Sequence, residues 1–466
     1  SQLLIMTPER LDACTRFWRS HWNWIPEVDL LVVDEFHLLG EQRRGPKLEC
    51  AISRFRRLNP LARVVGMSAT LGNRGQLADW INGTEYTTDQ RTIPLHWHRA
   101  SFKSAEQKQD ILLQHLQDTC AIDGQALVFV QSRRRAEQVA KAVHESGMPA
   151  SHHHAGLTHK SRQEVENAFR TGALKTLVCT PTLEMGVNLP ARYVFLYDLQ
   201  RFDGEGFSPL SVNQVWQRAG RAGRPGYDDE GHVVLFAPTW DRNGKKYEKG
   251  NFEPIHSQLN NARALAEQIV AEVGSGLCRT RKQLHRAFGN SLAHRQRRLH
   301  DLEPTLGEMI EAGMLVEKPS TSSESSKLLL QATPLGRVAV RHLLSPSTVL
   351  TMNRFMNQSL SFNFFDLLLL IASCEDQEPK IPVDFEDLTI LEEQIDQFSS
   401  GLVQSTYFEI TDLLGVSGKQ LLTAINTARI LYCWTQFGNL ELTAEQTGCF
   451  PSEIDRLREN AVRLLT

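Results

Sequence analysis

The sequence lacks several features that would place it in a specialised class of protein. Its 466 residues contain no apolar run near the ~18 residues that a membrane-spanning helix needs, so we expect no membrane partner. The eight cysteines never form a C-x-x-C pair, which argues against both a zinc ribbon and a disulfide framework. Reduced thiols in a cytoplasmic protein are therefore expected. The formal net charge is only -3, so contact with a polyanion must depend on local basic patches.

The composition is that of an ordinary globular protein, with length for roughly three to four domains. Strand and helix patterns alternate in residues 1–92 and 93–254, which predicts two α/β units with parallel sheets. Residues 255–345 have the pattern of three helices and a hairpin, and residues 346–466 are predicted to be all-helical. Residues 3–6 have the pattern of a core strand with nothing before it, so we expect the natural protein to begin further upstream.

A short apolar run followed by two acids is the most informative stretch. Residues 30–33 are Leu-Leu-Val-Val, which predicts a strand covered on both faces, and Asp34 and Glu35 follow it. Open parallel sheets bind ligands at the carboxyl ends of their strands. Asp34 is therefore placed to hold a hard cation such as Mg2+, and Glu35 to orient or deprotonate a water. Alone, an Asp-Glu pair is more often a solvated acidic turn.

Two other pieces of the first unit have a ligand-binding pattern. In Thr7-Pro8-Glu9-Arg10, the first two residues suit the cap and first turn of a helix, and such a helix start binds phosphate well. Ser68-Ala69-Thr70 follows a predicted strand, where two small hydroxyl groups can relay hydrogen bonds from a nucleotide site to a neighbouring surface. A plain capped helix and an ordinary loop are the alternatives for these two pieces.

Two loops of the second unit follow predicted strands or resemble ligand sites. Residues 180–190 come directly after a strand, as a ligand loop does. His152-His153-His154 has the appearance of a metal cluster. Because no carboxylate or cysteine stands at ligand spacing from it, we favour a structural loop over a metal site.

A glycine-rich stretch begins near Gln217. Arg221 and Arg224 stand three residues apart in it, which predicts both guanidinium groups on one face of a helical turn. A guanidinium group can stabilise charge that develops on a transferred phosphoryl group. A solvated face is the alternative, but it does not explain the interleaved glycines.

Taken in order, these motifs resemble those of a superfamily 2 DExH-box helicase of the Ski-like branch. Within that branch, His153-His154-Ala155-Gly156-Leu157 and other cues are most similar to archaeal fork-repair DNA helicases and the helicase domain of polymerase theta. The resemblance covers most of the chain. It implies an α/β fold with two RecA-like parallel-sheet domains, the first incomplete, followed by a winged helix and an all-α bundle of the ratchet type.

The resemblance also implies roles at a bound ATP. Asp34 would bind Mg2+ beside Glu35, which would position the attacking water, and Gln217 and His37 would link ATP to the nucleic-acid track. Ser68-Ala69-Thr70 would couple hydrolysis to motion. One arginine would act as an arginine finger, worth ~10³–10⁵ in rate. The residues expected at the nucleotide are Asp34, Glu35, Gly186, Asn188, Arg221 and Arg224.

Nucleic-acid contacts are implied in three places. Residues 201–213 lie where this branch carries a strand-separating β-hairpin, and Phe202, Phe207 and Leu210 are candidates for its wedge; a plain surface loop is an equal alternative. On the last helix, Arg456 and Arg463 are candidates for stacking on a base or binding phosphate, although relatives place a tryptophan where Arg463 stands. The residues expected along the strand backbone are Thr7, Pro8, Glu9, Arg10 and Thr180.

One departure from the family concerns phosphate binding. No G-x-x-x-x-G-K-[ST] motif occurs in the chain, so the loop that cradles phosphates is missing. We expect truncation at both ends to explain this, and we expect the fragment to be inactive alone. The full-length protein is predicted to be an ATP-dependent 3′–5′ DNA helicase that acts on forked or gapped DNA in repair or recombination.

The alternatives are an RNA helicase of the same branch and an ATP-independent nucleic-acid scaffold. RNA-processing members carry a large insertion in the winged helix, where this chain has only a serine-rich turn at residues 320–326, which favours DNA. The expected cofactors are ATP and Mg2+. The expected partners are single-stranded and forked DNA, bound by a monomeric motor that is cytoplasmic, or nucleoid-associated in a prokaryote.

Overall fold

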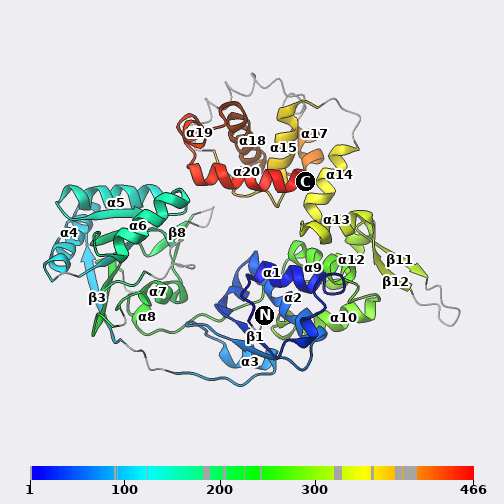
Figure 1. The fold of residues 1–466 in the computed structure, drawn as a ribbon, viewed down its shortest axis with the longest axis horizontal. Coiled ribbons are helices and arrows are strands. Elements are labelled where there is room, and N and C mark those ends of the chain that lie inside the picture. Colours follow the sequence, from blue (N-terminus) through cyan, green and yellow to red (C-terminus); the bar gives the residue numbers. More distant parts are fainter. Residues whose placement is uncertain are drawn as a thin grey trace.

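Four bodies make up the computed structural model (Figure 1). We call residues 3–88 lobe 1, residues 93–253 lobe 2, residues 255–345 the winged helix and residues 346–466 the bundle. Within the described ranges, every helix falls short of the length or hydropathy that crossing a bilayer requires. The structure describes residues 3–88, 91, 93–122, 124–181, 189–202, 206–224, 226–241, 244–319, 328–357, 362–383, 391 and 407–466.

Lobe 1 is a small parallel sheet flanked by helices. The strands β1 and β2 pair in parallel, and Thr7 caps α1 by accepting a hydrogen bond from the backbone N–H of Arg10 at 3.3 Å, as its sequence predicts. The elements of lobe 1 are α1 (Pro8–Arg16), η1 (Ile25–Glu27), β1 (Leu30–Val33), η2 (Phe36–Gly40), α2 (Arg44–Leu58), β2 (Arg63–Gly66) and α3 (Arg74–Ile81).

Two expectations about lobe 1 are wrong. Residues 3–6 form no strand, and Leu3 and Ile5 are exposed. The strand β1 is also not covered on both faces, because Leu30 is 50% and Val32 47% exposed. Val65 of β2 is 42% exposed as well, so in the described part of the chain one face of this two-stranded sheet is open.

Lobe 2 contains a six-stranded parallel sheet with the order β3-β10-β7-β4-β6-β5, which is the RecA-like arrangement predicted. Its elements are β3 (Leu95–Phe102), α4 (Ala105–Ala121), β4 (Ala126–Phe129), α5 (Arg133–Glu145), β5 (Ala150–His153), α6 (His159–Arg170), β6 (Thr176–Cys179), β7 (Tyr193–Leu196), β8 (Gln200–Phe202), β9 (Phe207–Pro209), α7 (Val212–Ala219), β10 (Gly231–Pro238) and α8 (Gly244–Glu248).

Alternation along β4 shows how the sheet of lobe 2 is covered. Leu127 and Phe129 pack into a core shared with α6 and α7, whereas Ala126 and Val128 face a core shared with α4 and α5. Both faces are therefore buried, as the apolar runs of the central strands predict. The strands β3 and β5 lack such runs because they are the two edges of the sheet, and the sequence did not predict them.

The last two bodies have the predicted classes. The winged helix contains α9 (Ala262–Gly274), α10 (Arg281–Gly289), α11 (Leu292–Arg295), α12 (Leu302–Glu311), the antiparallel pair β11 (Leu315–Pro319) and β12 (Leu328–Ala332), and α13 (Pro334–His342). The serine-rich turn between β11 and β12 lies outside the described residues. The bundle contains α14 (Pro346–Met356), α15 (Phe364–Ser373), α17 (Tyr407–Leu414), α18 (Lys419–Phe437), α19 (Leu440–Thr447) and α20 (Pro451–Leu465).

Buried charges join the winged helix to lobe 1. Arg54 of α2 is fully buried and binds Asp12 of α1 and, at 3.3 Å, Glu272 of α9. The same cluster extends through partly exposed groups at its ends. We call it the ion network; its members are Asp12, Arg16, Lys47, Arg54, Arg57, Glu267 and Glu272. It fixes α9 against α1 and α2, so the winged helix braces lobe 1.

A second buried contact at this boundary is a carboxyl group. Glu49 of α2 accepts hydrogen bonds from the Ser257 hydroxyl at 2.5 Å and from the Ala293 backbone N–H at 3.0 Å. Burial raises the pKa of Glu49 to about 7. The carboxyl group is therefore more easily protonated in the folded chain than in the unfolded one.

This raised pKa predicts a pH-dependent stability. The folded state binds the extra proton between pH 4.5 and about 7, so the contribution of Glu49 is complete below 4.5 and is lost as the pH rises through 7. Glu49→Gln mimics the protonated form and should flatten this fall in the free energy of unfolding. Urea unfolding across the range measures it, with the exposed Glu445→Gln as the control. An unchanged pH profile in Glu49→Gln would contradict the assignment.

Candidate functional site

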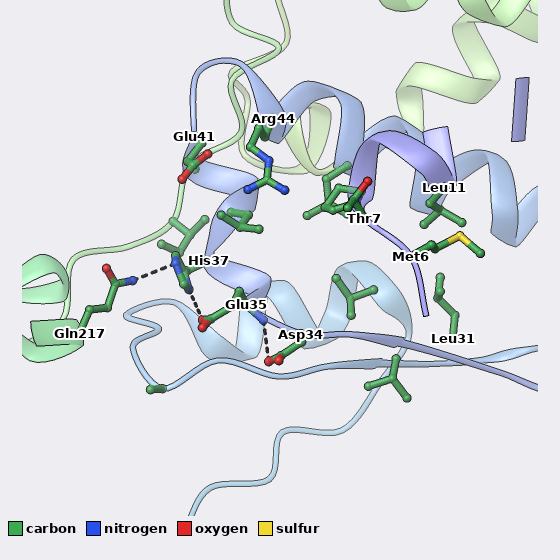
Figure 2. A pocket seen from close by; sticks show the side chains of 18 of the residues that line it. Met6, Thr7, Leu11, Leu31, Asp34, Glu35, His37, Glu41, Arg44 and Gln217 are labelled. Carbon is green, nitrogen blue, oxygen red and sulfur yellow. Dashed lines mark hydrogen bonds and ion pairs between the residues drawn. The ribbon is translucent and has the colours of Figure 1, made fainter. Parts of the chain in front are cut away.

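A large cavity lies between the two lobes and is lined by three of the six residues expected at the nucleotide, Asp34, Glu35 and Arg221 (Figure 2). Lobe 1 supplies the end of β1 and the loop after β2, and lobe 2 supplies α7 and the loop that follows it. Basic side chains that no nucleotide motif had assigned also line the cavity, including Arg43, Arg201 and Lys246. The predicted residues in its lining are Thr7, Pro8, Asp34, Glu35, His37, Ala69, Leu210, Gln217 and Arg221.

The two carboxylates at the end of β1 are exposed to this cavity. Glu35 has left-handed backbone angles, φ 51 and ψ 48, which are uncommon for a residue with a side chain. Its backbone N–H donates to Asp34 Oδ1 at 2.8 Å, which helps to hold this turn. Strain of this kind persists where surrounding structure over-determines it, often at functional sites. Exposed carboxylate oxygens at a strand end fit the ligand preference of Mg2+.

His37 connects both lobes through its two ring nitrogens. The amide nitrogen of Gln217 lies 2.8 Å from His37 Nε2, and since an amide N–H can only donate, Nε2 must be the acceptor. The proton of the neutral ring is therefore on Nδ1, which lies 3.2 Å from both Ser68 Oγ and Glu35 Oε2. Burial lowers the pKa of His37, which favours this neutral form. Figure 2 shows the bridge from α7 to the acidic turn.

The loop after β2 is fixed beneath this bridge. The Ser68 hydroxyl accepts a hydrogen bond from the Thr70 backbone N–H at 3.4 Å, and Ala69 lines the cavity. Thr70 is buried. Ser68 is thus the member of the Ser-Ala-Thr motif that contacts the site, through His37.

The structure separates the two arginines that the sequence had paired. Arg221 lines the cavity, but Arg224 does not, since its guanidinium group makes two 2.8 Å hydrogen bonds to Asp228 and a third at 2.9 Å to Gln125. The prediction that both lie on one face of a helical turn is wrong. The helix α7 ends at Ala219, and Gly223, at φ 87, turns the chain in a conformation that favours glycine.

The start of α1 presents a mixed surface. Thr7 is exposed, and the Arg10 guanidinium group stacks on the ring of Trp22 at 4.7 Å. Glu9 is bound by Arg44 of α2 at 2.7 Å, so its carboxylate is already paired. This pairing leaves Thr7 and the exposed edge of Arg10 as the groups suited to contact a strand.

Two short strands fit the hairpin predicted for residues 201–213, although residues 203–205 between them lie outside the described ranges. The strands β8 and β9 are antiparallel, with Phe207, 59% exposed, opposite Phe202. The side chain of Phe202 lies outside the described residues. The expected wedge role of Leu210 is wrong, because Leu210 is 1% exposed and packs in the core beneath α7.

The loop after β6 is described only at its two ends. Thr180 is 4% exposed and its backbone N–H donates to the His153 carbonyl at 3.2 Å, so its side chain has little surface available to a nucleic-acid strand. Gly186 and Asn188 lie outside the described residues, and their expected contacts with nucleotide remain predictions.

The helix α20 carries two exposed arginines. Arg456 and Arg463 are seven residues apart, which places them on nearly the same face of an α-helix, ~10 Å apart along its axis. Arg463 also donates to the Asp376 carbonyl at 3.4 Å. The amino end of α20 contacts lobe 2, where the Ser452 hydroxyl donates to the Ala155 carbonyl.

The histidine run has a carboxylate neighbour that its sequence spacing did not reveal. Ligand atoms of Glu137, His152 and His154 lie within 4.8 Å of one another. However, His154 Nδ1 accepts a hydrogen bond from the Gly156 backbone N–H at 3.1 Å, so the ring proton is on Nε2 and points to Glu137. A metal at Nε2 would displace that proton and oppose the Gly156 bond, which favours the structural interpretation.

Comparisons with known proteins find similarity to helicases. The family described as DEAD/DEAH box helicase matches residues 1–77, and the helicase conserved C-terminal domain matches residues 107–226. The ATP-dependent DNA helicase Hel308 of Thermoplasma volcanium is 27% identical over 473 residues, covering 91% of this chain and 68% of the relative. The ATP-dependent DNA helicase Hel308 of Pyrobaculum calidifontis is 30% identical over 427 residues, covering 80% of this chain and 59% of the relative.

A solved structure is also similar. The helicase Lhr of Mycobacterium smegmatis, bound to single-stranded DNA and AMP-PNP, has a TM-score of 0.49 and 18% identity. This chain is covered over 91% of its length and spans 57% of that chain.

Proposed function

This chain belongs to the superfamily 2 DExH-box helicases, which are ATP-dependent enzymes, and from that premise we propose that it is the motor part of an ATP-dependent 3′–5′ DNA helicase. Its substrate is forked or gapped DNA, and its role is in repair or recombination. The observation that carries the proposal is the His37–Gln217 contact, because it joins the lobes directly beside the acidic turn. The motor acts as a monomer in the cytoplasm.

The residues around the cavity divide the work of hydrolysis. A Mg2+ ion, when bound, would neutralise phosphate charge, and Asp34 and Glu35 are the groups that would hold it. Glu35 orients the attacking water, and Arg221 faces the developing charge from the other lobe. His37 contacts Glu35, Ser68 and Gln217. A movement of Glu35 during hydrolysis therefore shifts the His37 ring and changes its hydrogen bonds to Ser68 and Gln217.

The single-stranded DNA binds to surfaces outside the cavity. Thr7 and Arg10 contact its backbone from lobe 1, while Arg456 and Arg463 contact phosphates or stack on bases from the bundle. Phe207, exposed on β9 of the hairpin, separates the duplex. Closure of the lobes then advances the motor along one strand.

Residues 1–466 contain no phosphate-binding loop, so we propose that a segment outside these residues supplies it. We call residues 1–466 together with that segment the extended chain. The extended chain, with that loop, should unwind forked duplexes in an ATP-dependent manner when a 3′ single-stranded arm is present. Residues 1–466 alone should show no steady ATP hydrolysis. Asp34→Asn in the extended chain is the control for hydrolysis by a contaminant.

Gel-resolved unwinding of matched forks with a 3′ or a 5′ arm makes this measurement. A requirement for the 5′ arm would contradict the proposed polarity. Steady hydrolysis by residues 1–466 would show that the missing loop is dispensable.

A further inference from the structure

Two asparagines, one from each lobe, hold the short segment through which lobe 2 continues into the winged helix, whose first residue packs on lobe 1. We call residues 253–255 the connector. Asn213 of α7 accepts a hydrogen bond from the Glu253 backbone N–H and donates one to its carbonyl, both at 3.2 Å. Asn73 of lobe 1 makes the same pair of bonds with Ile255: it accepts from the Ile255 backbone N–H at 2.8 Å and donates to the Ile255 carbonyl at 2.9 Å. Each side chain thus imitates a neighbouring β-strand.

The residue between the two clamped positions is Pro254. Peptide bonds are rigid, and the pyrrolidine ring locks the φ angle of proline. The backbone between the held carbonyl of Glu253 and the held N–H of Ile255 therefore retains a single soft torsion, the ψ angle of Pro254. The connector is consequently a pivot with one main axis, in place of a loose tether.

Packing attaches each end of the connector firmly to its own lobe. The Glu253 carboxylate accepts from the first two backbone N–H groups of α7, those of Val212 at 2.7 Å and Asn213 at 3.0 Å. Ile255 is buried in the core of lobe 1 beside Phe36. A side chain at Gly72 would meet the carbonyl oxygens of residues 252 and 253 at 2.4 and 2.6 Å, so the lobes approach closely here.

Both clamps adjoin the groups of the candidate site. Asn73 follows Thr70 by three residues, at the end of the loop that holds Ser68 against His37. Asn213 lies one helical turn before Gln217, which bonds to the same histidine. A rotation about the connector therefore moves the two sides of the His37 bridge relative to each other.

We propose that Asn73 and Asn213 are positioning residues that make the connector the pivot of lobe closure. This inference rests on the proposed function for its catalytic consequence. The clamps restrict closure to a rotation that brings Arg221 toward the acidic turn. Their loss allows the lobes to sample orientations in which these groups do not meet.

The test measures the distance between lobes directly in residues 1–466. Spin labels at the exposed positions Leu61 and Lys141 report it by pulsed electron resonance. Removing two hydrogen bonds in Asn73→Ala or Asn213→Ala should raise the population of displaced lobe orientations about tenfold. Asn167→Ala, which removes a hydrogen-bonding asparagine from the outer surface of α6, is the matched control and should leave the distribution unchanged.

A second variant acts on the pivot without touching either clamp. Pro254→Ala frees the φ angle and should broaden the same distance distribution. If an asparagine variant fails to fold, Pro254→Ala still tests whether the connector is the pivot. Distributions identical to the parent in all three variants would overturn the proposal.

The catalytic consequence is measured in the extended chain. Asn213→Ala should lower kcat for ATP about tenfold, with an unchanged KM and unchanged strand affinity, because orientation and not binding is lost. If the extended parent is active and Asn213→Ala has the same kcat, the positioning role is overturned. If the extended parent itself hydrolyses no ATP, the proposed function fails, while the distance measurements still decide whether the connector is the pivot.

Discussion

Arg221→Ala in the extended chain should reduce kcat for ATP hydrolysis by ~10³–10⁵, the range over which an arginine finger acts. The guanidinium group reaches the cavity from lobe 2, opposite the carboxylates of Asp34 and Glu35. It would face charge that develops on the transferred phosphoryl group, so its removal affects the transition state more than the bound nucleotide. Single-turnover hydrolysis and strand binding by fluorescence anisotropy separate the two effects.

Arg224→Ala is the matched control, since it removes the same charge three residues away. Arg224 is held in lobe 2 by Asp228 and Gln125, so its loss should lower the thermal midpoint of the chain and reduce kcat far less than Arg221→Ala does. An equal loss of kcat in both variants would show that Arg224 leaves Asp228 during closure and joins the site. Nearly normal turnover in Arg221→Ala would remove its proposed role.

Arg54→Ala should lower the free energy of unfolding by ~3–5 kcal/mol, the usual cost of breaking a buried ion pair. Its guanidinium group is fully buried and bonds to Thr15 at 3.1 Å and Gln268 at 3.2 Å, besides the carboxylates of Asp12 and Glu272. Removal takes away the guanidinium group that binds both Asp12 and Glu272, whose side chains are 3% exposed. Each of these buried carboxylates then lacks one of its charged partners, which is the source of the penalty.

Urea unfolding followed by tryptophan fluorescence measures this loss, because several tryptophans lie in lobe 1 beside α1 and α2. Arg57→Ala is the control, since Arg57 binds Glu272 but is 29% exposed and its partner keeps Arg54. Its effect should be clearly smaller. Equal destabilisation by the two variants, or a loss under 1 kcal/mol in Arg54→Ala, would mean that the ion network contributes little beyond packing.

Local sequence determined those features whose causes are local. Thr7 and Pro8 specify the start of α1, and the buried runs of β4 and β6 specify central strands, because capping and burial depend on adjacent residues. The order of the short motifs was enough to indicate the family and the acidic turn at the end of β1. The classes of the last two bodies also followed from helical periodicity.

Only the tertiary structure decided which groups meet. Arg221 and Arg224 have equivalent sequence signals, yet the end of α7 and the turn at Gly223 send one to the cavity and the other to Asp228. The edge strands β3 and β5 have no apolar run to reveal them. The clamps of Asn73 and Asn213 join residues about 180 and 40 positions apart. Such contacts depend on how the lobes pack, which no local pattern specifies.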